Sequence, residues 1–419
     1  MHRFSYRNGE LWCEDARVAE IAKKVGTPLY LYSVNTMLDH LRKLQAAFSP
    51  VRALVCYAVK ANANLAICRA LAKSGAGFDV VSGGELRRVL QAGGNPGKIV
   101  YASVGKTVRE IEDAIRARIL LFNVESEQEL EQLDRAASRL GRRPKVSLRL
   151  NPEVDPHTHS FITTGHRASK FGIERKTVGS LFRRWKEFPH LNLAGLHIHI
   201  GSQILEPRPF VAAVRRALEV VRTARRSGAT LEYLNIGGGL GIVYRDEKPQ
   251  TAADYAKAVL PLLKRSRLKT ILEPGRFIVG NSGILVTRVL YLKQSHTRQF
   301  AIVDAGMNDL IRPSLYGAYH TIQPVAPRKG RETARYDVVG PVCESGDFFA
   351  KNRRLPVLQS GDLLAIMGAG AYGFVMSSNY NARPRPAEVL VHHGKYHTIR
   401  RRETYHDLVR GERIPSFLR

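Results

Sequence analysis

Lys60 is the residue of this sequence with the clearest potential for covalent chemistry. It follows the apolar run Ala53–Cys56, which is short and rich in strand-forming residues and is therefore typical of a buried strand. An amine at the rim of a core is partly desolvated, and desolvation favours the neutral form whose lone pair attacks carbonyl carbons. A surface lysine that merely follows a strand is the ordinary alternative, and Lys60 alone does not decide between the two.

Other residues that could carry chemistry follow further strand-like runs. In chain order they are Asp79, His199, Ser202, Gly237, Gly238, Gly239, Glu273, Gly275 and Arg276. Each has an ordinary explanation by itself, because a histidine on a strand is more often a satisfied core residue and a glycine triplet is more often a tight turn. A Glu-Pro-Gly-Arg segment is equally at home in a surface loop. The combination is more informative than any single member.

The combination matches the parts that are needed to hold pyridoxal phosphate. The backbone N–H groups of a glycine triplet can surround a phosphate, and the Ser202 hydroxyl can add a donor. The lysine-serine ending of a Walker loop and the spacing of a dinucleotide fingerprint are both absent, so the phosphate belongs to something other than a nucleotide. Glu273 can keep a ring nitrogen protonated, and His199 offers a flat stacking surface. With Lys60, these groups would hold the cofactor as an electron sink.

These residues need a scaffold that brings the ends of many strands together. Short strand-like runs alternate with amphipathic helical segments between about Pro28 and Pro274. The runs are Leu54–Val59, Phe78–Val81, Ile99–Ala102, Ile119–Asn123, Val146–Leu150, Leu193–Ile200, Tyr233–Ile236 and Thr270–Leu272, with helices expected at Asn64–Ser74, Gly84–Ala92, Ser126–Leu140 and Pro209–Ser227. This alternation predicts a TIM-like (β/α)8 barrel, whose chemistry lies at the C-terminal ends of the strands, although a doubly wound sheet would alternate in the same way.

The chain after about Arg276 has a different pattern. Short strand-like runs broken by glycine and proline replace the helical period. We therefore expect an α/β protein with a barrel domain over residues 27–275 and a second, mostly β-sheet or β-barrel domain over residues 276–419. Residues 1–26 contain a further strand-like run at Glu10–Cys13 and would complete the second domain.

Composition and charge exclude several classes of protein. No apolar run approaches the roughly 20 residues that span a bilayer, no apolar signal core opens the chain, and the four cysteines form no disulfide framework. We therefore expect a cytoplasmic protein without a membrane partner. The net charge of +28, from 65 basic and 37 acidic residues, raises nucleic acid as a partner. The basic residues are spread along the chain without a stacking motif or zinc-finger spacing, so no specific nucleic-acid binding is expected.

Longer ordered motifs connect these residues to a known family. They are Tyr57–Asn62, Asp79–Leu86, Ser169–Gly172, His199–Gln203, Gly237–Gly241, Glu273–Arg276, Asp304–Met307, Arg312–Tyr316, Cys343–Asp347 and Gly370–Gly373. With these motifs the chain resembles the diaminopimelate decarboxylases, which belong with ornithine and arginine decarboxylases to the fold-type III enzymes that use pyridoxal phosphate. The resemblance implies decarboxylation of meso-2,6-diaminopimelate to L-lysine and carbon dioxide, the last step of lysine biosynthesis. An ornithine- or arginine-type decarboxylase of the same fold is the alternative.

The resemblance also implies a role for each matched residue in cofactor binding. Lys60 would bind the cofactor covalently, His199 would stack on its ring, and Glu273 would pair with the ring nitrogen. The remaining cofactor-binding residues would be Asp79, Ser202, Gly237, Gly238, Gly239, Gly275, Arg276 and Tyr372, with the three consecutive glycines, Ser202 and Tyr372 at the phosphate. Lys60, His199 and Cys343 would form the catalytic set, and their presence gives no sign of a silent homologue.

The second domain would supply the substrate side of the reaction. The resemblance makes Cys343 the proton donor and places it, with Glu344, in the partner subunit, so a homodimer would complete each active site. Guanidinium groups match a carboxylate in a bidentate way, so Arg276 and Arg312 can bind the distal carboxylate of diaminopimelate. A loop-fixing salt bridge is the ordinary alternative for Arg312. The full expected substrate-binding set is Arg276, Arg312, Tyr316, Glu344 and Tyr372.

The long segment Asn151–Lys170 is expected to be a loop that covers the site. His157 and His159 lie within it and raise the possibility of a metal site. No third ligand stands at a recognisable spacing, so we expect no metal and favour a substrate-covering lid.

Overall fold

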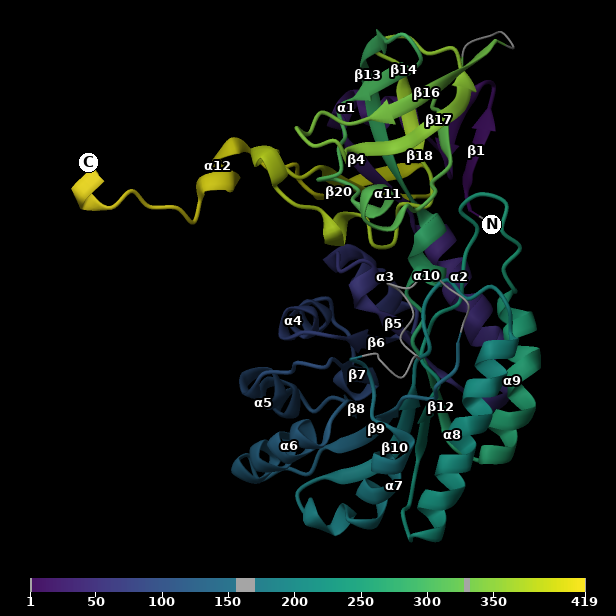
Figure 1. Ribbon diagram of the computed structural model, residues 1–419, viewed down its shortest axis with the longest axis vertical. Coiled ribbons are helices and arrows are strands. Elements are labelled where there is room, and N and C mark those ends of the chain that lie inside the picture. Colours follow the sequence, from purple (N-terminus) through teal and green to yellow (C-terminus); the bar gives the residue numbers. More distant parts are fainter. Residues whose placement is uncertain (1, 156–169, 328–331, 419) are drawn as a thin grey trace. The chain divides into compact units, whose positions relative to one another are not determined.

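The computed structural model describes residues 2–155, 170–327 and 332–418. The chain forms two compact units, each with its own fold (Figure 1). Residues Leu38–Val243 and Glu247–Ile278 form the first, which we call the barrel unit. Residues Met1–Met37, Tyr244–Asp246 and Val279–Arg419 form the second, which we call the β unit.

Eight parallel strands close the barrel unit into a ring. In chain order they are β5 (Leu54–Ala58), β6 (Gly77–Val80), β7 (Ile99–Ala102), β8 (Leu121–Val124), β9 (Lys145–Leu150), β10 (Asn192–Ile198), β11 (Tyr233–Asn235) and β12 (Lys269–Leu272). Each strand pairs with its neighbour in sequence, and β12 pairs with β5 to close the circle. The closure confirms the predicted (β/α)8 barrel and excludes the open, doubly wound alternative.

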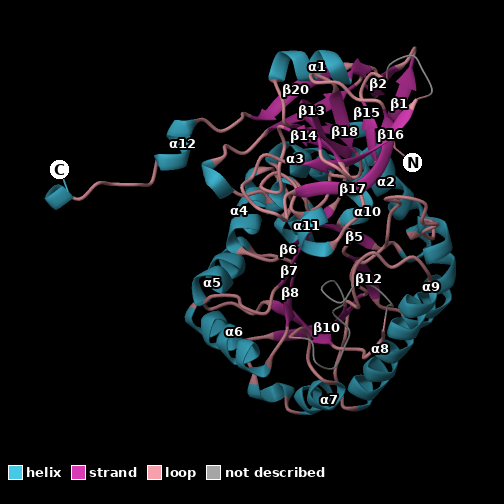
Figure 2. Cartoon of the chain, turned by 45° about the horizontal axis from the view of Figure 1, so that its top comes forward, coloured by secondary structure: helices cyan, strands magenta, loops and turns pink. Residues whose placement is uncertain are grey.

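Helices follow the barrel strands and surround them (Figure 2). They are α3 (Leu65–Lys73), α4 (Gly83–Gln91), α5 (Val108–Ala117), α6 (Glu127–Arg139), α7 (Arg175–Arg183), α8 (Arg208–Arg226) and α9 (Ala252–Ser266), and α2 (Val34–Ala47) precedes β5. The side chains of Asn64, Ser82 and Ser126 accept hydrogen bonds from the first turns of α3, α4 and α6. These N-caps explain why the predicted helix starts agree with the structure within one or two residues.

A nine-stranded sheet organises the β unit. Its strands are β4 (Leu29–Ser33), β13 (Gly283–Gln294), β14 (Gln299–Val303), β15 (Ile322–Pro324), β16 (Thr333–Val339), β17 (Phe348–Pro356), β18 (Leu363–Ile366), β19 (Ala387–His392) and β20 (Lys395–Arg400). A small sheet of β1 (Phe4–Arg7), β2 (Glu10–Cys13) and β3 (Ala16–Arg17) precedes helix α1 (Val18–Val25). The mostly β second fold is as predicted. Short helices α10 (Arg276–Val279), α11 (Arg312–Tyr316) and α12 (Tyr405–Val409) follow the barrel.

Strand β4 is an interior strand of this sheet. It pairs with β13 on one side and with β19 on the other, so residues 29–33 contribute to the β unit. The predicted domain boundaries at residues 27 and 276 stay predictions. In the structure, however, the segment that opens the predicted barrel domain is hydrogen-bonded into the β-unit sheet.

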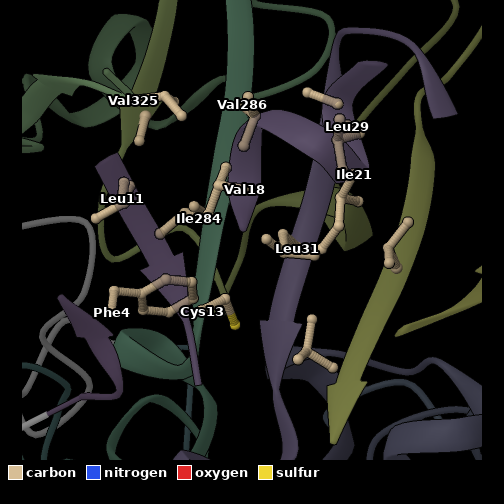
Figure 3. Close-up of a cluster of buried hydrophobic side chains, with 14 of the residues drawn as sticks. Phe4, Leu11, Cys13, Val18, Ile21, Leu29, Leu31, Ile284, Val286 and Val325 are labelled. Carbon is tan, nitrogen blue, oxygen red and sulfur yellow. The ribbon is translucent and has the colours of Figure 1, made fainter. Parts of the chain in front are cut away.

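Apolar side chains from the start and the end of the β unit form one buried core (Figure 3). Phe4, Leu11 and Val18 from the N-terminal elements contact the cluster that also contains Ile284 and Val286 of β13. Because burial of apolar surface is the main stabilising term of a fold, this shared core explains why the N-terminal residues belong to the β unit.

No helix in the part of the chain that the structure describes is long and apolar enough to cross a membrane.

Candidate functional site

Lys60 lies directly after β5, in the single 3-10 turn Val59–Ala61. Its Nζ is 2.9 Å from Oδ2 of Asp79 on the neighbouring strand β6. The Lys60 side chain is 37% exposed, whereas that of Asp79 is fully buried. Burial and the nearby charge of Glu273 raise the pKa of Asp79 to about 6, against the opposing effect of Lys60. The amine is thus anchored to the barrel at one side and still reaches solvent.

Glu273 follows β12 and is surrounded by three buried hydrogen-bonding side chains. Nδ2 of Asn123 and Nδ2 of Asn235 donate to Oε1 at 3.0 and 2.5 Å, and Nε2 of His197 lies 3.1 Å from Oε2. Burial raises the pKa of this carboxyl, but the contacts with His197, Lys60 and Asn235 outweigh it and hold the pKa well below its usual range. Glu273 is therefore charged at neutral pH, as a partner for a protonated ring nitrogen has to be.

Sequence reasoning found Glu273 but missed the side chains that hold it. Asn123 and Asn235 lie near the C-terminal ends of β8 and β11, Ser147 lies in the middle of β9, and all three are fully buried. Ser147 Oγ donates to Oδ1 of Asn123 at 2.5 Å, which orients that amide toward Glu273. Parallel strands buried on both faces are normally apolar, so a single amide near the end of such a strand is the signal that could have revealed them.

The turn Gly237-Gly238-Gly239 follows β11. Gly237 and Gly239 have φ values of 70° and 111°, a left-handed conformation that favours glycine. The N–H of Gly237 donates to Asn235, and that of Gly238 donates to Nδ1 of His199 at 3.2 Å. Two of the three N–H groups expected at the phosphate therefore donate to side chains of the protein. The N–H of Gly239 has no hydrogen-bond partner among the described residues.

Arg276 and Ser202 lie together beside this turn in the barrel unit. Nη2 and Nε of Arg276 donate to Oγ of Ser202 at 3.1 and 3.3 Å, and the arginine is only 6% exposed. Gly275 allows the segment to approach β5, since a Cβ at this position would lie 3.2 Å from the Cβ of Ala58. The structure therefore brings a guanidinium and a hydroxyl together, which is a suitable pair for an anion.

His199 directly follows β10 and accepts the Gly238 hydrogen bond through Nδ1. Burial, followed by the positive charges of Arg149 and Lys60, lowers the pKa of His199 well below its usual value. The ring is therefore neutral, with its proton on Nε2. Arg149 is itself buried and paired with Glu125, at 2.8 Å from both carboxylate oxygens, a pair that sequence reasoning did not single out.

The predicted substrate residues Arg312 and Tyr316 lie at the two ends of α11 in the β unit. Ser314, between them, donates from Oγ to the carbonyl oxygen of Gly346 at 2.5 Å. This hydrogen bond fixes the helix against the loop Cys343–Asp347. Two parts of the chain that sequence analysis expected to supply substrate-binding residues are thus held together within one unit.

The loop itself presents its functional side chains to solvent. Cys343 and Glu344 are exposed; the Cys343 N–H donates to Oδ1 of Asn381 at 2.7 Å, and Tyr380 Oη lies 3.3 Å from Oε2 of Glu344. The other cysteines, Cys13, Cys56 and Cys68, are buried, and burial raises the pKa of each thiol. Cys343 is therefore the thiol that is placed for chemistry.

Tyr372 has an unusual backbone conformation. Its φ is 55°, in the left-handed region that bulky side chains rarely adopt. Such a residue costs on the order of 1–3 kcal/mol and persists only where the surroundings hold it in place. This strain agrees with a functional position for the tyrosine.

The barrel residues fit pyridoxal phosphate. They offer the amine of Lys60, the charged carboxylate of Glu273, the neutral ring of His199 and the Arg276–Ser202 pair, which correspond to the groups that the cofactor requires. In addition, Oδ1 of Asp79 is buried without a hydrogen-bond partner. An unpaired buried acceptor is costly, so this site is incomplete until a bound group satisfies it.

No group of three or more His, Cys, Asp or Glu side chains is arranged to hold a metal ion within residues 2–155, 170–327 and 332–418. Most of the predicted lid, including His157 and His159, lies outside the described residues.

Comparisons with known proteins place the chain in a family. Residues 34–280 match the model described as "Pyridoxal-dependent decarboxylase, pyridoxal binding domain". A diaminopimelate decarboxylase from Vibrio cholerae is 49% identical over 405 residues, covering 96% of this chain and 97% of the relative.

Two solved structures are also similar over nearly their whole length. The Helicobacter pylori diaminopimelate decarboxylase, complexed with L-lysine, has a TM-score of 0.90 at 41% identity and covers 94% of this chain and 98% of its own. The M. jannaschii enzyme, also in complex with L-lysine, has a TM-score of 0.95 at 37% identity, with 99% and 98% covered. The chain belongs to the diaminopimelate decarboxylase family of pyridoxal-dependent enzymes.

Proposed function

We propose that this protein decarboxylates meso-2,6-diaminopimelate to L-lysine and carbon dioxide with pyridoxal phosphate. The observation that carries the proposal is the arrangement at the barrel end, where Lys60 lies 2.9 Å from buried Asp79 and Glu273 is held in its charged form. The near-full-length similarity to diaminopimelate decarboxylases supports the choice of substrate. The reaction is a carboxy-lyase step and ends lysine biosynthesis.

The barrel residues bind and tune the cofactor. When bound, pyridoxal phosphate supplies an electron sink for the pair that carbon dioxide leaves behind. Lys60 would hold the cofactor covalently through Nζ, and Asp79 would stabilise the positive charge of the free amine. Glu273 keeps a proton on the ring nitrogen, because a neighbouring carboxylate favours the cationic form. His199 would offer its flat ring to the cofactor ring, and Arg276 with Ser202 would bind the phosphate.

The β-unit residues recognise the rest of the substrate. Arg312 and Tyr316 bind the distal carboxylate, and Glu344 binds the distal ammonium. Cys343 holds the proton that is delivered to Cα after the carboxylate has left, since a thiol is a credible acid at neutral pH. Tyr372 contributes to both phosphate and substrate binding.

We further propose a homodimer in which each chain provides Cys343 and Glu344 to the active site of the other. The exposure of both side chains in the single chain supports this arrangement, because a proton donor needs shielding from bulk water to act selectively. Lysine biosynthesis draws on cytoplasmic metabolites, so we propose a cytoplasmic enzyme.

Release of carbon dioxide from meso-diaminopimelate, with and without added pyridoxal phosphate, tests the function. We expect cofactor-dependent turnover, a preference over ornithine and arginine of at least about 10²-fold in kcat/KM, and no turnover by a Lys60→Ala variant. The Lys60→Ala protein should also lack the visible absorption of the covalently bound cofactor. Preference for ornithine or arginine would replace the proposal with the same-fold alternative.

A further inference from the structure

Arg312 is held by a buried histidine of the same unit. Its Nη1 lies 2.9 Å from Nε2 of His320, and Nδ1 of His320 lies 2.8 Å from the carbonyl oxygen of Met367 on the far side of the ring. Arg312 is 6% exposed and His320 is fully buried. A chain of two hydrogen bonds thus connects the guanidinium to the backbone that follows β18.

The two partners of His320 determine its protonation state. A carbonyl oxygen only accepts, so Nδ1 carries the proton, and a guanidinium only donates, so Nε2 is the acceptor. His320 is therefore a neutral imidazole. It orients Arg312 without adding a negative charge through this contact, whereas a carboxylate in its place would compete with a substrate carboxylate for the same cation.

Tyr244 provides a second, flat support for Arg312. The guanidinium carbon lies 4.7 Å from the centre of the Tyr244 ring, and that ring meets His320 edge-on at 5.3 Å. Thr321 Oγ1 donates to the carbonyl oxygen of Tyr244 at 2.9 Å and fixes its backbone. A cation stacked on a buried aromatic ring is stabilised and loses freedom to rotate out of plane.

We infer that His320 and Tyr244 are positioning residues that hold Arg312 ready for the distal carboxylate of the substrate, and so determine selectivity for ligands that end in an amino acid. The inference rests on the proposed function of Arg312. A bidentate pair needs both N–H groups of the fork in the carboxylate plane, so an arginine fixed from one edge and one face loses less entropy when the carboxylate binds.

Binding of L-lysine and of cadaverine to the holoenzyme tests this inference. L-Lysine retains the distal carboxylate and cadaverine lacks it, while their carbon chains and terminal amines are the same. We expect His320→Leu, which removes the acceptor, to weaken L-lysine inhibition about tenfold or more and to leave cadaverine inhibition within about twofold. The KM for diaminopimelate should rise while kcat changes little, as for lost ground-state binding.

Two further variants separate positioning from a general structural effect. His320→Gln offers an amide that can accept from Arg312 and donate to Met367, so it should recover much of the L-lysine affinity. Tyr319→Leu removes the neighbouring aromatic ring, which packs on Arg353 instead, and should change neither ligand's affinity.

The outcomes also separate the inference from the proposed function. Equal weakening of L-lysine and cadaverine in His320→Leu, or unchanged binding of both, would overturn the positioning role although the wild-type enzyme still consumes diaminopimelate. A wild-type protein that does not consume diaminopimelate would overturn the function itself. Tyr244→Leu should reproduce the His320→Leu selectivity, and Tyr244→Phe should not, because phenylalanine keeps the stacking ring.

Discussion

Gly238 lies so close to Glu273 that a side chain on the glycine would overlap the carbonyl oxygen of the glutamate. The N–H of Gly238 also donates to His199. Gly238 therefore sets how closely the glycine turn approaches Glu273 and His199. The turn is expected at the cofactor phosphate, Glu273 at the ring nitrogen and His199 on the ring. A change at Gly238 would therefore displace groups proposed for both cofactor binding and cofactor activation.

We predict that Gly238→Ala weakens binding of pyridoxal phosphate about tenfold or more, because the turn and the end of β12 have to separate. Equilibrium dialysis or a fluorescence titration of the cofactor-free protein measures the change. Gly105→Ala is the matched control, since no atom lies within 4 Å of a Cβ at that position. Equal affinities of the two variants would show that the turn can relax without harm.

Most of the barrel site could be predicted because it depends on local pattern. In a (β/α)8 barrel the C-terminal ends of all strands lie at one face. Lys60, Asp79 and Glu273 stand at or near the ends of strand-like runs, so their proximity can be predicted without knowing any long-range contact. The distance between Lys60 and Asp79 follows directly from the pairing of adjacent strands β5 and β6.

What could not be predicted depends on pairing between distant segments. The run Leu29–Ser33 is apolar on both faces, as a barrel strand would be, but its partners β13 and β19 lie some hundreds of residues away. Strand β17 carries the charged stretch Lys351–Arg354 and pairs with β16 through two register shifts, so it lacks the alternation that marks a strand. A different limit hid the contact of His320 with Arg312, which are only eight residues apart. Two polar residues near a short helix have no periodic signature.

The donors around Glu273 predict the behaviour of Glu273→Gln. Glutamine is uncharged and has one acceptor oxygen where the carboxylate has two, so its NH2 group has to face either the two amides or Nε2 of His197. We expect a loss of about 1–3 kcal/mol in the free energy of unfolding at pH 7, measured in urea, and a large loss of activity. Glu273→Asp keeps the charge and serves as the control.

The stability difference should depend on pH in a defined direction. The pKa of Glu273 is lower in the folded chain than in the unfolded chain, so its contribution is fully present above about pH 4.5 and is lost as the pH falls toward the folded value. Wild type and Glu273→Gln should therefore become more similar in stability below about pH 4.5. A gap that is constant from pH 7 down to pH 4 and below would contradict the charged state of the carboxylate.

Glu85 gives the opposite pH dependence. It lies in the first turn of α4, where its Oε2 accepts the N–H of Val81 at 2.9 Å, and burial raises its pKa to about 7. The folded chain therefore binds this proton more tightly than the unfolded chain, and stability falls as the pH rises from about 4.5 to 7.

We predict that Glu85→Gln stabilises the cofactor-free protein at pH 8 and has little effect at pH 4.5. A tenfold difference in proton affinity between the folded and unfolded chains corresponds to about 1.4 kcal/mol, so the gain at pH 8 has an upper bound of about 3 kcal/mol. Urea unfolding at the two pH values measures it. Glu110→Gln is a matched control, because the pKa of this carboxyl is lowered and its removal should destabilise the protein at pH 8.

The proposed sharing of Cys343 between the two chains of a dimer predicts the activity of dimers that combine two different variants. Lys60 belongs to the barrel unit and Cys343 to the β unit. Homodimers of Lys60→Ala or of Cys343→Ala should each be inactive in carbon dioxide release, because each lacks one of the two proposed catalytic groups in every site. If each site combines the Lys60 of one chain with the Cys343 of the other, a heterodimer of the two variants has one site with both residues and one with neither. Co-expression with two different affinity tags, followed by tandem purification, isolates this heterodimer.

The heterodimer should then show about half of the wild-type activity per dimer, since one of its two sites is intact. A dimer whose sites each use a single chain would have one defect in every site and would remain inactive. A dimer of two Lys60→Ala chains that carry the same pair of tags fixes the background. Because both variants differ from wild type by one truncated side chain, activity above this background cannot come from the tags and reports the origin of Cys343 directly.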